Sequence, residues 1–199
     1  MNSAKSKLFS KILRGFRHPI RSYKNTLEKH PMIVQSIQTG CLYGTSDLIA
    51  QVFCEYKSFE EINLKRTVVF VTTGTFFTGP IVSLWYRFLA KKIGTTSTSV
   101  IIKKVLIDQF LFAPCFHMFL ITTINTLHGH GTTIIKEQIR LKYVDILTTS
   151  LKLWPAIQLI NFTFVPTNYQ VLFGQIVALF WNVYISWKTQ QGIQIQVAM

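Results

Sequence analysis

The chain has 199 residues, of which 49% are hydrophobic and only 15% charged, and its mean hydropathy is +0.30. An ordinary soluble domain carries roughly 25% charged residues, so this composition argues against a soluble fold and favours contact with lipid. Lys and Arg number 21 against 8 Asp and Glu, and they lie in short clusters between long apolar runs. That arrangement disfavours a nucleic-acid-binding face, whereas membrane loops and an organellar address explain it.

The first 22 residues predict a basic amphipathic helix. They contain six Lys or Arg residues and no acid. An apolar stripe recurs at helical spacing within them, formed by Phe9, Leu13, Phe16 and Ile20. Such a segment suits either a mitochondrial address or a helix on an anionic membrane surface. We therefore divide the chain into this extension (1–22), a membrane helical bundle (23–188) and a polar C-terminal tail (189–199).

Five apolar segments approach the roughly 20 residues that a helix needs to cross a bilayer. They are Pro31–Cys54, Thr67–Tyr86, Val105–Leu127, Ile146–Val165 and Thr167–Trp187. The second and fifth lack Asp, Glu, Lys and Arg, and the others contain only Asp47, Asp108 and Lys152, respectively. A soluble bundle would need charged faces repeating every 3.6 residues, and these are absent. The sequence predicts an all-α integral membrane bundle with four or five transmembrane segments.

The uncertainty in the number of spans comes from two prolines. Pro155 and Pro166 interrupt the last third of the chain, and proline breaks or kinks a helix. Residues 146–187 therefore form either two spans or one kinked span followed by an interfacial helix.

Charge alternates between the loops. Residues 1–30 hold eight Lys or Arg against one acid, whereas Glu55–Arg66 balances three against three. The next region holds five cations and no acid: Arg87, Lys91, Lys92, Lys103 and Lys104. The region 136–145 is mixed again. Basic loops stay on the side from which the chain is not translocated, so the alternation indicates a chain that crosses the membrane repeatedly.

Polar residues inside the spans fall on shared helix faces. The candidates for a pore lining or an interhelix polar face are Asp47, Gln51, Asp108, Gln109, Lys152, Gln158 and Asn161. Gly40 and Gly44 share the face of Asp47 and make a small-xxx-small pair that lets another helix approach closely. A charge at the bilayer centre costs at least ~2.5 kcal/mol, so the two aspartates and Lys152 are expected to point inward, with Asp–Lys pairing. Both a water-filled pathway and hydrogen bonding between helices satisfy this pattern.

Residues for catalysis are scarce. The sequence has no phosphate-binding glycine loop, nucleophile elbow or paired-carboxylate motif. His128 and His130 flank a glycine without a nearby acid or cysteine, which is a weak metal signal. We expect a protein that is not an enzyme and that carries no metal or cofactor.

The longest distinctive motifs are Trp154 to Pro166 (WPAIQLINFTFVP) and Trp181 to Lys188 (WNVYISWK). Between about Tyr23 and Lys188, the motif residues as a whole resemble the family of Mpv-seventeen and the twenty-two-kilodalton peroxisomal membrane protein. They are Gly40, Gly44, Arg66, Gly79, Pro80, Trp85, Tyr86, Pro114, Trp154, Pro155, Phe162, Pro166, Trp181, Tyr184, Ser186 and Trp187. Two features depart from the family pattern: Gln170 stands where many relatives carry Arg, and the extension before Tyr23 is additional.

The resemblance implies a small protein, usually drawn with four spans, of the mitochondrial inner membrane or the peroxisomal membrane. The motif Trp154 to Pro166 is more similar to the mitochondrial branch, which predicts an inner-membrane location. It also implies a gated, non-selective channel for small solutes or metabolites, connected with mitochondrial homeostasis and mitochondrial DNA maintenance. The implied partners are the lipid bilayer and those solutes, with no direct contact to nucleic acid, and a homo-oligomer stays open. The rival hypothesis is a non-conducting membrane scaffold or assembly protein.

Overall fold

The computed structural model describes residues 25–27, 29–94, 97–164 and 170–190, and its regular elements there are all helical. The predicted all-α class is thereby confirmed. The expected N-terminal helix (1–22), Pro166 and residues 191–199 lie outside the described residues. The α-helices are α2 (Pro31–Ile49), α3 (Leu64–Thr72), α4 (Gly79–Ile93), α5 (Thr98–Ile107), α6 (Ala113–Leu127), α7 (Thr132–Phe164) and α8 (Gln170–Gln190).

Three π-helical turns extend or join these helices. They are Ala50–Cys54 after α2, Thr73–Thr78 between α3 and α4, and Asp108–Phe112 between α5 and α6. The two joined rods, Leu64–Ile93 and Ser99–Leu127, are the described helices long and apolar enough to cross a membrane. They contain the predicted segments Thr67–Tyr86 and Val105–Leu127. Pro80 and Pro114 lie in the first turns of α4 and α6, where a missing backbone N–H is tolerated.

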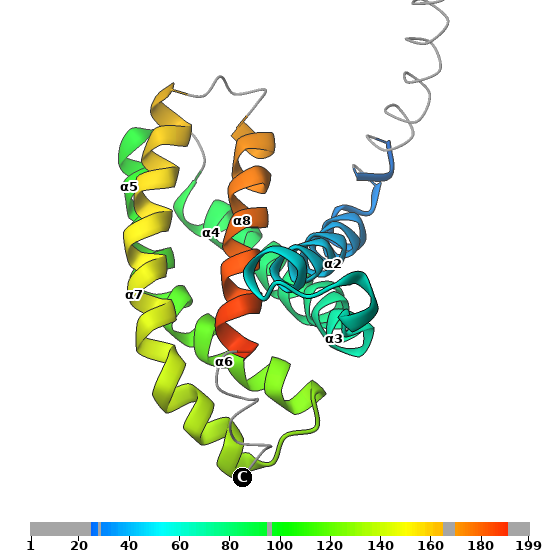
Figure 1. The fold of residues 1–199 in the computed structure, drawn as a ribbon. Coiled ribbons are helices and arrows are strands. Elements are labelled where there is room, and N and C mark those ends of the chain that lie inside the picture. Colours follow the sequence, from blue (N-terminus) through cyan, green and yellow to red (C-terminus); the bar gives the residue numbers. More distant parts are fainter. Residues whose placement is uncertain (1–24, 28, 95–96, 165–169, 191–199) are drawn as a thin grey trace, which may run out of the picture.

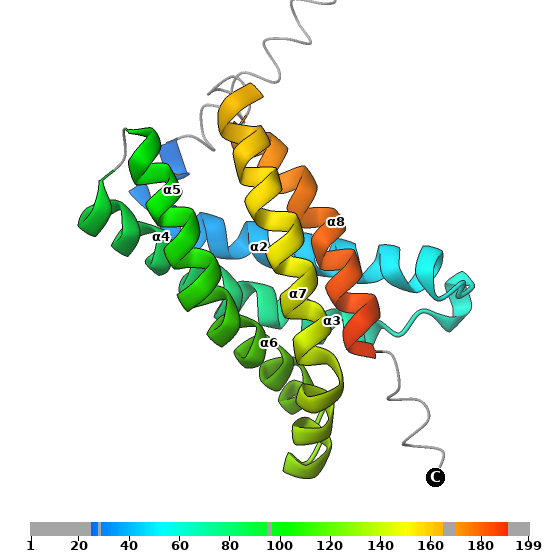
Figure 2. The same ribbon diagram turned by 90° about the vertical axis from the view of Figure 1, so that its left-hand side faces the viewer.

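The last third of the chain forms two long helices. Pro155 lies inside α7, which continues to Phe164, so this proline does not end the helix. Helices α7 and α8 pack side by side (Figures 1 and 2). Their contacts run in opposite directions along the two helices, because Asp145 pairs with Lys188 and Trp154 packs on Trp181. Helices α7 and α8 therefore form an antiparallel pair, and the number of times that they cross the membrane stays a prediction.

Glycines bring α2 against the rod Leu64–Ile93. A Cβ placed on Gly74 would lie 2.8 Å from the Cα of Gly40, and one on Gly79 would lie 2.5 Å from the Cα of Ser36. A Cβ placed on Gly44 would lie 2.6 Å from Cγ2 of Val71. The close approach predicted from the small-xxx-small pair is confirmed, and its partner surface is α3 with the π-helical turn Thr73–Thr78.

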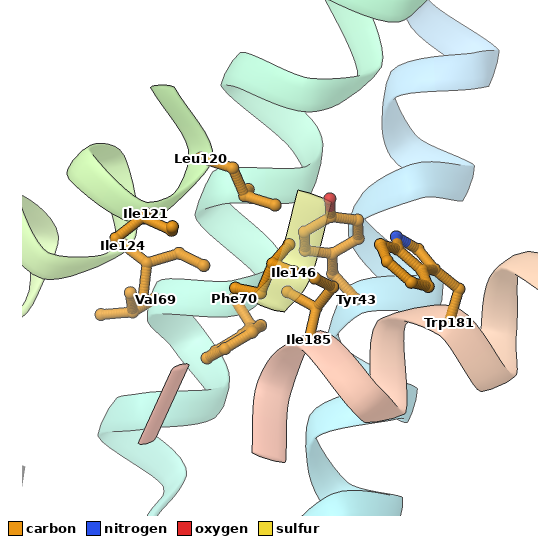
Figure 3. Close-up of a cluster of buried hydrophobic side chains, with 9 residues drawn as sticks. All are labelled: Tyr43, Val69, Phe70, Leu120, Ile121, Ile124, Ile146, Trp181 and Ile185. Carbon is orange, nitrogen blue, oxygen red and sulfur yellow. The ribbon is translucent and has the colours of Figure 1, made fainter. Parts of the chain in front are cut away.

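The hydrophobic core joins α2, α3, α6, α7 and α8 (Figure 3). Its members are Tyr43, Val69, Phe70, Leu120, Ile121, Ile124, Ile146, Trp181 and Ile185. Other large apolar side chains remain outside the core; Phe76, Phe110 and Phe180 are each about 70% exposed, at 71%, 73% and 68%. Exposed aromatic residues of this number are unusual on a soluble monomer, and they provide a surface for lipid.

Candidate functional site

Two π-helical turns bring polar side chains into the bundle. A π turn inserts an extra residue and so changes which side chains face inward beyond it, and such turns are frequent at functional sites. The turn after α2 contains Gln51, and the turn between α5 and α6 contains Asp108 and Gln109. All three side chains are buried. Two polar sites result, one around Asp47 and the other around Asp108.

The first site is a closed network around Asp47, whose side chain is 0% exposed. One carboxylate oxygen accepts hydrogen bonds from Arg66 Nε at 2.7 Å and Ser186 Oγ at 2.6 Å. The other oxygen accepts from Gln51 Nε2 at 2.9 Å and Thr67 Oγ1 at 2.7 Å. Four donors, one of them cationic, satisfy this buried charge.

Arg66 connects the Asp47 network to α8 and to the loop that contains Glu55. Its Nη1 lies 2.7 and 2.9 Å from the two carboxylate oxygens of Glu55, and its Nη2 donates to Ser186 Oγ at 2.9 Å. Asn63 caps α3 by accepting from the Arg66 backbone N–H at 3.0 Å, which fixes where the guanidinium enters the bundle. The network therefore pins α2, α3 and α8 together.

The second site lacks a cation. Asp108 is buried, and its two carboxylate oxygens accept hydrogen bonds from Trp85 Nε1 at 2.8 Å and Gln109 Nε2 at 3.1 Å. Among the described residues, Asp108 forms no ion pair. Two neutral donors thus replace the four donors that surround Asp47, so this carboxylate is the less compensated of the two.

Further polar atoms in the interior have no hydrogen-bond partner in the described part of the chain. They are Gln109 Oε1, Gln158 Oε1 and both ring nitrogens of His117. His117 is 4% exposed and its ring packs against Trp181, with centroids 5.8 Å apart. Buried polar atoms normally find partners, so water or a solute is the expected partner of these groups.

Aromatic rings connect the second site to the opposite side of the bundle. Trp85 stacks on Phe112 at 4.7 Å, and Phe112 stacks on Phe116 at 5.1 Å. Across the bundle, Trp181 packs on Trp154 at 6.1 Å and on Tyr184 at 5.3 Å. Tyr184 in turn contacts Trp187. The aromatic motif residues on α4, α7 and α8 therefore serve largely as packing surfaces between helices, whereas Tyr86 is exposed.

Two expectations about the polar residues are wrong. Lys152 does not point inward, because its side chain is exposed on α7 and makes no ion pair within the described residues. Its long aliphatic stem lets the ammonium reach the bilayer interface, which removes the need for an internal partner. The expected Asp–Lys pairing inside the bundle is wrong, since Asp47 pairs with Arg66. The side chains of Asn161 and Phe162 lie outside the described residues.

Sequence reasoning missed three members of the first site. Glu55 and Asn63 lie in the loop Glu55–Arg66, and Thr67 begins an apolar segment, so their positions in the sequence do not predict a buried polar network. A signal existed for Asn63, because an asparagine immediately before an apolar helical run is a typical N-cap. Nothing in the spacing indicated that Glu55 would turn back toward Arg66.

A histidine corner lies at the end of α8. His128 and His130 belong to the loop between α6 and α7; His128 Nε2 lies 3.3 Å from Gln190 Nε2, and His130 Nδ1 lies 2.9 Å from Asn125 Oδ1. Because an amide nitrogen only donates, the contact with Gln190 requires a neutral His128 ring. Burial lowers the pKa of His128 to about 4, with smaller contributions from positive charge at His130 and Arg66.

This corner predicts a pH dependence of stability. Between the ordinary pKa of 6.5 and about 4, the unfolded chain binds a proton at His128 and the folded chain does not, so stability falls as pH drops through this window. Thermal unfolding in detergent, followed by tryptophan fluorescence, should therefore show a larger loss between pH 7 and pH 5 for the wild type than for His128→Gln. His30→Gln, which alters an exposed histidine, is the control and should keep the wild-type loss. Identical pH profiles for wild type and His128→Gln would contradict the assignment.

Comparison with known proteins decides the family. A family model described as Mpv17 / PMP22 matches residues 125–186. The "Mitochondrial inner membrane protein Mpv17" of Danio rerio is 37% identical over 171 residues, which cover 86% of this chain and 97% of the relative. The Homo sapiens protein of the same name has the same identity and coverage. "PXMP2/4 family protein 2" of Dictyostelium discoideum is 36% identical over 168 residues, which cover 82% of this chain and 87% of the relative.

The chain belongs to the Mpv17/PMP22 family. It is a membrane protein of the mitochondrial inner membrane, as the names of its similar relatives state. No solved structure matches it. The resemblance inferred from the motifs is confirmed, and the location predicted from the mitochondrial branch is confirmed with it.

Proposed function

We propose that this Mpv17/PMP22 family protein is a gated, non-selective channel for small solutes or metabolites across the mitochondrial inner membrane. It thereby supports mitochondrial homeostasis and the maintenance of mitochondrial DNA. The observation that carries the proposal is a set of buried polar atoms that have no hydrogen-bond partner among the described residues, namely Gln109 Oε1, Gln158 Oε1 and the His117 ring nitrogens. Such atoms in a membrane bundle favour a hydrated interior.

The proposed topology has the rods Leu64–Ile93 and Ser99–Leu127 as two spans. Helix α2 with its π turn supplies another, and the antiparallel pair α7 and α8 completes four spans, or five if both helices cross. A helix of 21 residues such as α8 is roughly 32 Å long, which matches the hydrocarbon thickness. The protein has no enzymatic role in this proposal, and its partners are the bilayer, the solutes and, in an oligomer, further copies of itself.

Asp108 is the residue whose charge we expect to influence the ion selectivity of the pathway. In the part of the chain that the structure describes, its carboxylate accepts hydrogen bonds from two neutral donors and no cation, so it contributes negative potential to the interior. The Asp108→Asn variant should lose part of any preference for cations over anions, because that potential is removed.

Single-channel recording tests this proposal. Purified protein in planar bilayers under a KCl gradient should give discrete current steps, and Asp108→Asn should shift the reversal potential toward zero. Glu137→Gln is the matched control, since Glu137 pairs with Arg140 on the surface of α7 and should leave the reversal potential unchanged. Absence of current from folded, inserted protein would overturn the channel.

A scaffold is the second candidate, and a different observation favours it. The Asp47 network satisfies the carboxylate completely, and the glycine contacts hold α2 rigidly against its neighbour. This half of the bundle offers no polar atom to a solute at Asp47. In a scaffold, substitutions at the glycines would abolish function while Asp108→Asn would be tolerated.

A further inference from the structure

Within the described part of the chain, the tip of the α4–α5 hairpin carries positive charge without any acidic residue nearby in the sequence. Residues 62–107 contain no Asp or Glu. Five cations gather near the tip: Arg87, Lys91, Lys92, Lys103 and Lys104. Four of them are exposed and Lys104 is half-buried. Helices α4 and α5 pack against each other and form one hairpin (Figure 2), so these cations belong to one end of the fold.

Among the described residues, no acidic side chain pairs with these cations. The ion pairs of the described residues join Lys57 and Arg66 to Glu55, Arg66 to Asp47, Arg140 to Glu137 and Lys188 to Asp145. None of them involves a residue of the α4–α5 tip. The tip therefore differs from the other described basic regions, each of which is at least partly neutralised within the chain.

The tip lies at the boundary between the two apolar rods and the loop that joins them. Arg87 lies six residues before the end of α4, and Lys103 lies five residues after the start of α5, so each is less than about 10 Å along its helix from the tip. Lysine and arginine side chains this close to the end of a span extend to the level of the lipid headgroups.

Apolar side chains on the same two helices complete the surface. Leu84 and Phe88 on α4 are 57% and 52% exposed, and Ile102 and Leu106 on α5 are 53% and 49% exposed. Exposed apolar groups below a row of cations match a phospholipid, whose acyl chains need hydrocarbon contact and whose phosphate needs positive charge. A soluble acidic protein would match the cations but not these apolar groups.

We propose that the α4–α5 tip is a binding site for anionic phospholipids, which hold their phosphates between the lysines of the two helices. The cations neutralise the headgroup, and the exposed apolar side chains of α4 and α5 contact the acyl chains. This lipid fixes the separation of the two helix ends, which no ion pair of the described residues does. The proposal does not depend on ion conduction.

Native mass spectrometry of the full-length protein in detergent tests the site. The protein is titrated with phosphatidylglycerol or phosphatidylcholine, and the retained lipids are counted for wild type, Lys91→Gln/Lys92→Gln and Lys103→Gln/Lys104→Gln. The wild type should bind phosphatidylglycerol more tightly, and each double variant should weaken that binding by on the order of tenfold, because each cation near the headgroups contributes about 1 kcal/mol.

Lys57→Gln/Lys136→Gln removes the same charge elsewhere and is the control, which should retain the wild-type affinity. Unchanged thermal unfolding of the variants separates loss of lipid from loss of fold, since all four tip lysines are on the surface or half-buried. Equal affinity of the wild type for the two lipids would overturn the proposal, and so would an equal loss in the control. Because this experiment measures bound lipid, its outcome does not depend on whether single-channel recording detects a current.

Discussion

Replacing Arg66 by Gln should lower the free energy of unfolding by about 3–5 kcal/mol, the usual effect of removing one partner from a buried ion pair. The variant leaves the Asp47 carboxylate fully buried without its cation. It also removes the guanidinium hydrogen bonds to Glu55 and Ser186, so α3 loses these connections to the Glu55 loop and to α8. Thermal unfolding in detergent, followed by tryptophan fluorescence, measures the loss.

Two further variants separate the ion pair from a general effect of lost charge. Lys65→Gln alters the exposed neighbour of Arg66 and should change stability by less than about 0.5 kcal/mol. Asp47→Asn/Arg66→Gln removes both charges and should be more stable than Arg66→Gln alone, because no unpaired charge stays buried. If the double variant were less stable than the single one, the uncompensated Asp47 could not be the cause.

Adding one methyl group at Gly74 or Gly79 should destabilise the protein by about 1–3 kcal/mol for each position. The new Cβ would lie 2.8 Å from the Cα of Gly40 in the first case and 2.5 Å from the Cα of Ser36 in the second. Because backbone atoms cannot rotate away as side chains do, α2 must move as a whole. Thermal unfolding in detergent, followed by tryptophan fluorescence, measures the loss. This readout needs no thiol-reactive dye, which would label the exposed cysteines before unfolding.

The glycines themselves supply graded controls. Gly174→Ala meets nothing within 4 Å on α8, so it should be neutral or stabilising by roughly 0.5–1 kcal/mol through helix propensity. Gly44→Ala meets the Val71 methyl group at 2.6 Å, which can rotate, and should fall between the extremes. Equal destabilisation at Gly174 and Gly74 would show that close helix approach is not what these positions require.

Apolar run length accounts for much of the fold that was predicted. A run of 20 residues without charges has few ways to satisfy its backbone in lipid except as a helix, so the helical segments followed from composition. The four-residue spacing of Gly40 and Gly44 similarly predicted a close contact between helices. The boundaries of the helices did not follow from the sequence, because α7 accommodates Pro155 and because π turns join α3 to α4 and α5 to α6 into rods that are longer than the predicted segments.

The candidate site was predictable where helical spacing governed it. Asp47 and Gln51 are four residues apart, and they do share one face and a hydrogen bond. Arg66 and Ser186 were known only as motif residues, since the contacts that join them to Asp47 span 19 and 139 positions of the chain. For Lys152 the prediction was wrong. Its position in an apolar segment predicted a charge that points inward, whereas its side chain is exposed, and its long aliphatic stem makes this possible.

The sequence by itself determined that the chain is helical, that it belongs in a membrane and which family it joins, because these depend on composition, local periodicity and ordered motifs. Only the tertiary structure decided that Asp47 is fully compensated and that Asp108 is not. Both are single aspartates in apolar segments, each with a glutamine nearby, so the local sequence does not separate them. The difference arises because α3 brings a guanidinium to one carboxylate, whereas α4 brings only an indole N–H to the other.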